Sequence, residues 1–196
     1  MRFLLLLLLT SCSSVHVSTG YIDPMFGGKI KPDARNLSAL HTSIQAESVL
    51  LETENFRIDV GVGPSITTPL EDYSPLYGAE ISNRLTYKAT ETVRPYFFHA
   101  HGIQYHDSLW YQETAINPVE AVGSDVRYAF STRIGAGIAY QATENFTIDL
   151  SYQWVHFSSG KSMFGDKTRQ FFGLPKAKTN NGFEGGAVFL GVSYEW

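Results

Sequence analysis

The sequence is poor in the features that define several common protein classes. Cys12 is its only cysteine, which excludes an internal disulfide. Only 17% of the 196 residues are charged and the net charge is −4, so nucleic acid is not an expected partner. The one continuous apolar run, 3–9, falls far short of the roughly 18 residues that a membrane helix needs. These absences favour a single domain that does not cross a membrane by helices.

The short apolar run has a different interpretation. It follows Arg2 and is typical of a signal-peptide core, so we assign 1–11 to a signal peptide and 13–196 to one folded domain. The sequence at 9–12 resembles a bacterial lipobox, which implies cleavage before Cys12 and lipidation of its thiol. An ordinary secretory cleavage site with an incidental cysteine is the alternative. Both readings predict export from a bacterial cytoplasm.

What the sequence has in quantity is alternation of apolar and polar residues. A β-strand alternates faces with a period of two, and about 9–11 residues suffice to cross a bilayer. Seven stretches alternate in this way, 92–105 less cleanly than the others, and an eighth, 14–26, does so weakly. Counted back from the C-terminus, the seven are 182–196, 145–158, 127–141, 92–105, 76–89, 55–66 and 40–52.

The connections between these stretches also alternate, in length. Three similar short segments, 52–55, 89–92 and 142–145, each lie between two alternating stretches and are predicted to be hairpin turns. The intervening connections are longer and polar, at about 67–75, 106–126 and 159–181. Short turns on one side and long loops on the other are typical of bacterial outer-membrane barrels.

The two faces of the stretches agree with that class. Charged residues such as Glu80 and Arg84 lie opposite the aromatic and aliphatic ones, and the last strand ends on Trp196. We therefore predict an all-β fold, an eight-stranded antiparallel transmembrane β-barrel of the bacterial outer membrane. An aromatic-rich soluble sheet and a soluble periplasmic lipid-binding barrel are the alternatives. The stretch 93–105 has no clear phase, and its His99 and His101 are expected in the interior or at the rim.

Three side chains of a catalytic kind share the apolar phase of the last two stretches. His156 and Ser158 continue the face of Trp154, and counting back by two from Trp196 reaches Glu184. If the termini are periplasmic, all three lie at the outer surface. We predict Ser158 as nucleophile, His156 as base and Glu184 as the carboxylate that orients the base.

The same part of the chain resembles a known family, the outer-membrane lipid A deacylases. The resemblance rests on 156–158, on 181–184 before the aromatic-ended last strand, and upstream on 94–97 and 135–137. It implies an eight-stranded barrel that hydrolyses an ester-linked acyl chain of lipopolysaccharide, with the triad roles given above. The family usually has asparagine at the position of Ser159, where it is implicated in the oxyanion site. In this chain the expected oxyanion donors are the backbone N–H groups near Ser159 and Gly160.

Further expectations concern ligands and partners. The segment 159–181 is basic, and its cations are predicted to bind the phosphates of lipid A. These cations are Lys161, Lys167, Arg169, Lys176 and Lys178. Three histidines, at 99, 101 and 106, lack carboxylate partners nearby, so neither a metal nor another cofactor is expected. The expected partners are lipid A and the outer membrane, with a homodimer left open. The alternative function is a non-enzymatic small barrel, structural or adhesive.

Overall fold

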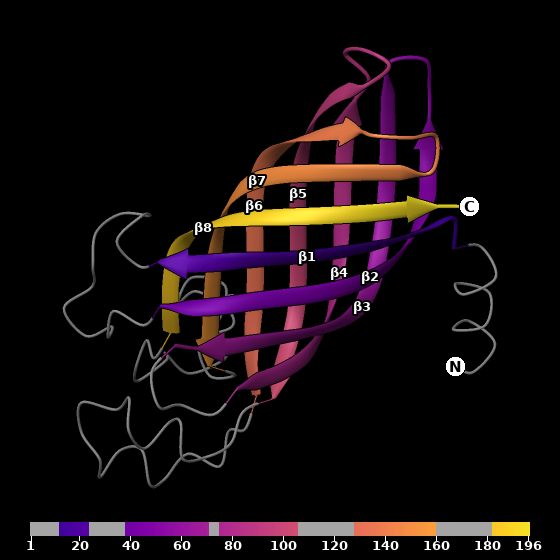
Figure 1. Cartoon of the computed structure of the whole chain (residues 1–196). Coiled ribbons are helices and arrows are strands. Elements are labelled where there is room, and N and C mark those ends of the chain that lie inside the picture. Colours follow the sequence, from indigo (N-terminus) through magenta and orange to yellow (C-terminus); the bar gives the residue numbers. More distant parts are fainter. Residues whose placement is uncertain (1–11, 24–37, 71–74, 106–127, 160–181) are drawn as a thin grey trace, which may run out of the picture.

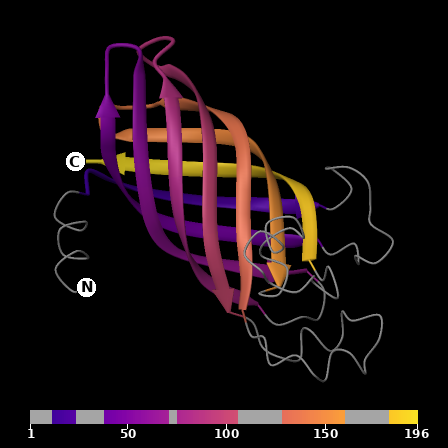
Figure 2. The same ribbon diagram turned by 180° about the vertical axis from the view of Figure 1, so that it is seen from behind.

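The strands close into one barrel in which each pairs with the next and β1 pairs with β8 (Figure 1). This computed structural model describes residues 12–23, 38–70, 75–105, 128–159 and 182–196. All pairings are antiparallel, and Figure 2 shows the same wall from behind. The strands are β1 (Ser14–Asp23), β2 (Ala39–Glu52), β3 (Phe56–Pro69), β4 (Leu76–Tyr87), β5 (Val93–Tyr105), β6 (Tyr128–Gln141), β7 (Phe146–Ser159) and β8 (Gly182–Glu195).

The predicted fold is therefore confirmed, including its weakest element, β1. The boundaries differ by a few residues: β4 ends at Tyr87 and not at 89, β7 includes Ser159, and β3 continues to Pro69, so that the first residues of the predicted loop 67–75 belong to the strand. Thr67 is fully buried, and its Oγ1 lies 2.8 Å from Nδ1 of His41 in β2. Polar residues continue the strand here because the barrel interior is itself polar.

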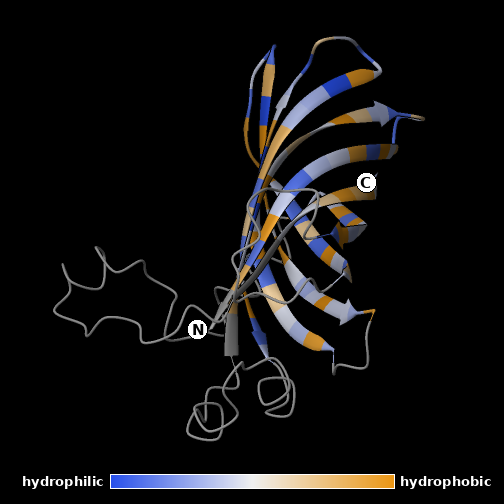
Figure 3. Cartoon of the chain, turned by 90° about the vertical axis from the view of Figure 1, so that its left-hand side faces the viewer, coloured by the Kyte–Doolittle hydropathy of each residue, from blue (hydrophilic) through white to orange (hydrophobic). Residues whose placement is uncertain are grey.

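The wall is apolar outside and polar inside, and hydrophobic and hydrophilic residues accordingly alternate along the strands (Figure 3). Ile81, Ile138 and Leu190 are more than half exposed on the outside, whereas Glu80 and Arg133 are buried inside. This is the arrangement of an outer-membrane β-barrel, whose outer surface contacts lipid. The alternative of a soluble lipid-binding barrel is wrong, since such a barrel needs an apolar interior and a polar exterior. Within the described ranges, no helix is long and apolar enough to span a bilayer.

The three repeated segments form three turns of the same construction. In each, a threonine Oγ1 accepts a hydrogen bond from the backbone N–H three residues later, at 3.0 Å for Thr53, 2.8 Å for Thr90 and 3.1 Å for Thr143. The backbone N–H of the same threonine donates to the carbonyl of that third residue, for example at 2.8 Å for Thr53. The shared threonine of the sequence repeats thus belongs to a turn motif.

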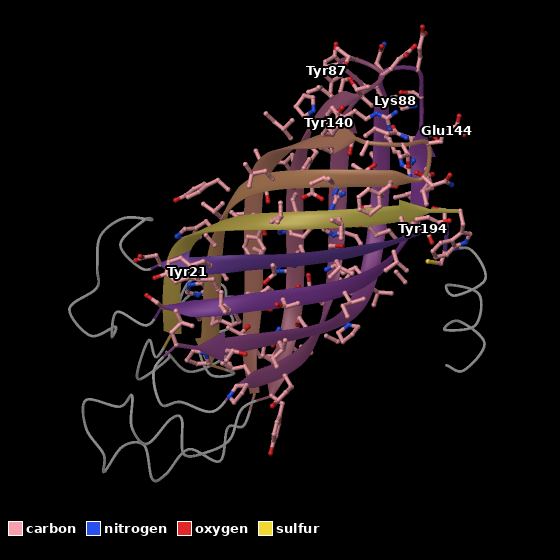
Figure 4. All side chains as sticks on the ribbon, in the orientation of Figure 1. Tyr21, Tyr87, Lys88, Tyr140, Glu144 and Tyr194 are labelled. Carbon is pink, nitrogen blue, oxygen red and sulfur yellow. The ribbon has the colours of Figure 1, made fainter. Side chains whose placement is uncertain are left out.

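The three turns and both termini of the barrel lie at one end, here called the turn end (Figure 1). The opposite end, where β1 ends and β2 begins, is called the far end. Tyr87, Tyr140 and Tyr194 lie on the outside near the turn end, and Tyr21 lies near the far end (Figure 4). Aromatic side chains at both ends of the apolar band match the interfacial girdles of membrane barrels.

The interior is filled with paired polar side chains. Arg133 Nη2 donates to Glu80 Oε2 at 2.6 Å, and the guanidinium lies between the rings of Phe98 and Phe189, 4.9 and 5.0 Å from their centroids. Nearer the turn end, His16 Nε2 lies 3.0 Å from Asp149 Oδ2. Toward the far end, the side of the interior lined by β1, β2, β7 and β8 carries an apolar cluster of six side chains at most 1% exposed. These are Ile22, Ala39, Val155, Phe157, Ala187 and Phe189.

The strands tilt, so a row of paired residues climbs around the wall. One outward row begins at Val15, near the turn end of β1, and ends at Glu184, near the far end of β8. Its members are Val15, Ala46, Val62, Ile81, His101, Thr132, His156 and Glu184. The first half of this row is apolar, and the half toward the far end is polar.

Candidate hydrolase site

The residues predicted to act together meet at the far end of β7 and β8. His156 in β7 is the direct register partner of Glu184 in β8. Ser158 is the next residue along the same phase of β7 and pairs with Gly182. Directly opposite residues in an antiparallel pair have Cβ atoms about 4.5–5.5 Å apart, and alternate residues along a strand are about 7 Å apart. Position 156 is thus adjacent to both 158 and 184, which suits a base between a nucleophile and a carboxylate.

His156 lies on the lipid-facing side of the wall. The residues beside it, Val155 and Phe157, are buried in the interior, whereas His156 and Trp154 are half-buried on the outside. The imidazole stacks on the indole of Trp154, with ring centroids 5.8 Å apart and an interplanar angle of 18°. This stacking restrains the ring at the edge of the apolar band.

Only some of the remaining predicted site residues lie within the described part of the chain. Ser159 is the last residue of β7, and Gly160 lies outside the described residues, as do the five predicted phosphate-binding cations. The predictions for these residues therefore remain predictions. Cys12 is half-buried at the turn end, where its Sγ donates to the carbonyl of Ser14 at 3.0 Å. It lies beside the C-terminus, because the Trp196 N–H donates to the carbonyl of Ser13 at 3.2 Å.

His99 and His101 correct the sequence interpretation. Neither faces the interior: His101 is exposed and His99 half-buried on the outside of β5, while Tyr96, Phe98 and Ala100 are the inward residues. Sequence phasing failed because Tyr96, Phe97 and Phe98 are consecutive aromatics, two inside and one outside. The inward rings have a reason to be there, since Tyr96 lies under Arg84, 4.8 Å from its guanidinium, and Phe98 lies under Arg133.

These histidines add polar groups that the sequence did not connect with the site. Nδ1 of His101 lies 3.2 Å from Oγ1 of Thr132, and Thr132 is the register partner of His156. The connection from His101 through Thr132 to His156 depends on how β5, β6 and β7 pair. The periodicity of a single strand does not predict that pairing. Among the described residues, no three His, Cys, Asp or Glu side chains are grouped to hold a metal ion.

A histidine between a serine and a carboxylate position can support nucleophilic catalysis. The imidazole takes the serine proton as the oxygen attacks an acyl carbon, and the carboxylate orients and stabilises the imidazolium. On a lipid-facing wall, the acyl group reaching such a site would belong to a membrane lipid. The rigid interior supports this arrangement, since the backbone between Val155 and Phe157 is held by buried side chains from inside the barrel.

The comparisons with known proteins agree with the fold. The outer membrane enzyme PagL has a TM-score of 0.58 at 11% identity, covering 91% of this chain and 98% of that one. Neisserial surface protein A has a TM-score of 0.50 at 13% identity, covering 95% and 98%. No protein-family model matches the sequence, and no curated protein matches it. At these identities the similarity establishes the class, a small outer-membrane β-barrel, and leaves its activity to the site.

Proposed function

We propose that the protein is a serine esterase of the outer membrane that removes an ester-linked acyl chain from lipid A. The observation that carries the proposal is that His156, whose imidazole lies on the lipid-facing side of the far end, is the register partner of position 184 and is next to position 158 along the same phase. Polar groups on the lipid-facing surface of a membrane protein are costly and mark functional sites by default. The similarity of the fold to that of an outer membrane enzyme, PagL, is consistent with this function.

The proposed orientation puts the far end at the cell surface. Short turns of outer-membrane barrels are periplasmic, and here both termini lie with the short turns. The far end then faces the outer leaflet, where lipid A resides. Lipidation of Cys12, at the turn end, would attach its acyl chains in the inner leaflet and is compatible with this orientation. The cations of 159–181 would lie beside the site and bind lipid A phosphates.

The test compares lipid A from cells that express the wild type or its Ser158→Ala variant. Mass spectrometry should show a loss of one acyl chain with the wild type and none with Ser158→Ala. Ser48→Ala is the matched control, because Ser48 lies on an outward phase of β2, as the register partner of Val60, far from the site. Both variants must reach the outer membrane in equal amounts. An identical acylation pattern for the wild type and Ser158→Ala would refute the enzyme and favour the non-enzymatic barrel.

A further inference from the structure

The polar half of the climbing row extends well beyond the candidate catalytic residues. From Glu184 and His156 it continues through Thr132 in β6 to His101 in β5, and His99 follows two residues along β5. We call His99, His101 and Thr132 the lipid-facing track. Its members contact one another, with 3.2 Å between His101 Nδ1 and Thr132 Oγ1 and 4.3 Å between the two imidazole centroids.

The surroundings of the track are apolar and exposed. Its outward neighbours Ile81, Phe97, Ile103 and Ile134 are 60%, 46%, 53% and 41% exposed. Two histidines and a threonine thus interrupt a surface that otherwise suits hydrocarbon. Charged or strongly polar residues on the lipid face of a barrel lower stability increasingly toward the bilayer midplane. The contacts within the track satisfy only part of its hydrogen-bonding groups, which points to a ligand outside the fold that satisfies the rest.

The depth of the track in the membrane indicates which chemical groups of the ligand lie beside it. Strands about 4.8 Å apart and tilted by about 40° make a row climb roughly 3 Å per strand. His101 therefore lies about 9 Å deeper in the membrane than Glu184, and His99 lies deeper still. A lipid whose ester is held at His156 and Ser158 would place the upper part of its acyl chains, below the headgroup phosphates, along the track. The hydrogen-bonding groups available at that depth are uncharged.

We propose that the lipid-facing track is a subsite for hydroxyl and amide groups on the upper acyl chains of the bound lipid. The imidazoles and the threonine hydroxyl supply both donors and acceptors for such groups. The subsite would select lipids with hydroxylated or amide-linked chains over glycerophospholipids with plain chains. This proposal deepens the proposed function and rests on it for the position of the lipid. A lipid is favoured over a second copy of the chain because the track is continuous with the candidate site, which a second copy would cover.

The experiment measures lipid retention by the full chain carrying Ser158→Ala, so that bound lipid is not consumed. The probes are lipid A, whose chains carry hydroxyl and amide groups, and cardiolipin, which has two phosphates and plain acyl chains. Native mass spectrometry from detergent reports the retained lipid. Adding His99→Leu, His101→Leu and Thr132→Val should lower lipid A retention about tenfold, because two or three hydrogen bonds are lost. Cardiolipin retention should change less than twofold.

The control variant is Thr19→Val with Thr42→Val, an exposed threonine pair on β1 and β2 whose Oγ1 atoms lie 3.0 Å apart. It should leave the retention of both lipids unchanged. Unchanged lipid A retention in the track variant would overturn the subsite, as would an equal loss of cardiolipin. Loss of a dimer in the track variant, without loss of lipid A, would overturn it in favour of an interface between copies. If lipid A retention depends on the track residues but the wild type has no esterase activity, the subsite is supported and the proposed esterase function is refuted.

Discussion

His156 of β7 and Glu184 of β8 are direct register partners across the last strand pair of the barrel. The two residues are 28 positions apart in the chain, and only the antiparallel pairing of β7 with β8 brings them together. Because position 158 lies one step further along the same phase, the residues proposed as nucleophile, base and carboxylate follow one another in that order. This order has consequences that differ between the three residues.

Glu184→Gln should reduce esterase activity less than His156→Asn does. Loss of the base removes proton transfer altogether, at a cost of about 10⁶-fold in a comparable triad, whereas loss of the orienting carboxylate there costs about 10⁴-fold because the base is still present. Initial rates of fatty acid release from lipid A in detergent provide the measurement. Glu54→Gln, an exposed carboxylate in the turn between β2 and β3, is the control and should keep full activity. Equal rates for the wild type and both site variants would contradict the assigned roles.

Arg133→Met should destabilise the barrel strongly. Arg133 is fully buried and bonds to Glu80 at 2.6 Å, so its removal leaves the buried Glu80 carboxylate with only Ser131 and His41 beside it, at a cost of about 3–5 kcal/mol. Urea unfolding in lipid vesicles, followed by tryptophan fluorescence, measures the free energy of unfolding. The double variant Arg133→Met/Glu80→Gln should be more stable than the single one, because it has no unpaired charge.

A surface pair provides the comparison for that experiment. Lys88 Nζ donates to Glu52 Oε1 at 2.7 Å at the turn end, where Glu52 is exposed. Lys88→Gln should cost no more than about 1 kcal/mol, since exposed ion pairs contribute little. If Arg133→Met and Lys88→Gln had the same small effect, the interior pair would not be a main determinant of stability.

Most of the wall could be predicted from the sequence, because strands with one lipid-facing and one polar face carry a strong two-residue period. The phases of β3, β4 and β6 are read directly from residues such as Phe56, Arg84 and Ile134. The phase of β5 could not be predicted, because cation–π contacts with Arg84 and Arg133 favour aromatic residues on its inner face as well. Periodicity detects a face only where its chemistry differs from that of the opposite face.

The candidate site was predictable in part for the same reason. The shared phase of His156, Ser158 and Glu184 follows from counting along two adjacent strands joined by one connection. The link from His156 to His101 crosses β6, and it depends on the tilt and closure of the barrel. No local pattern in the sequence encodes the relative offset of β5 and β7, so the lipid-facing track emerged only from the register.

Thr143→Ala should destabilise the hairpin of β6 and β7 by about 1 kcal/mol, because the Phe146 N–H loses its acceptor Oγ1 at 3.1 Å. The same change at Thr53 and Thr90 should have a similar effect, because Oγ1 of each accepts from the backbone N–H three residues later. Thr92→Ala is the control in the same kind of turn, since Thr92 accepts from the Gln141 N–H through its backbone carbonyl. Unfolding free energies that are equal for Thr143→Ala and Thr92→Ala would exclude the proposed role of the hydroxyl.

The protein should not conduct ions, because an eight-stranded barrel leaves only enough room inside for side chains. An apolar cluster packs inside the barrel toward the far end. The paired side chains of Arg133 and Glu80 occupy the interior beside it. Phe189→Ala should remain silent in planar bilayers but lose about 3–5 kcal/mol of stability, since the ring is fully buried against Arg133 and His41. Val188→Ala, at the lipid-facing neighbour, should lose much less. Stepwise currents through the wild type would show that the interior opens and would contradict this prediction.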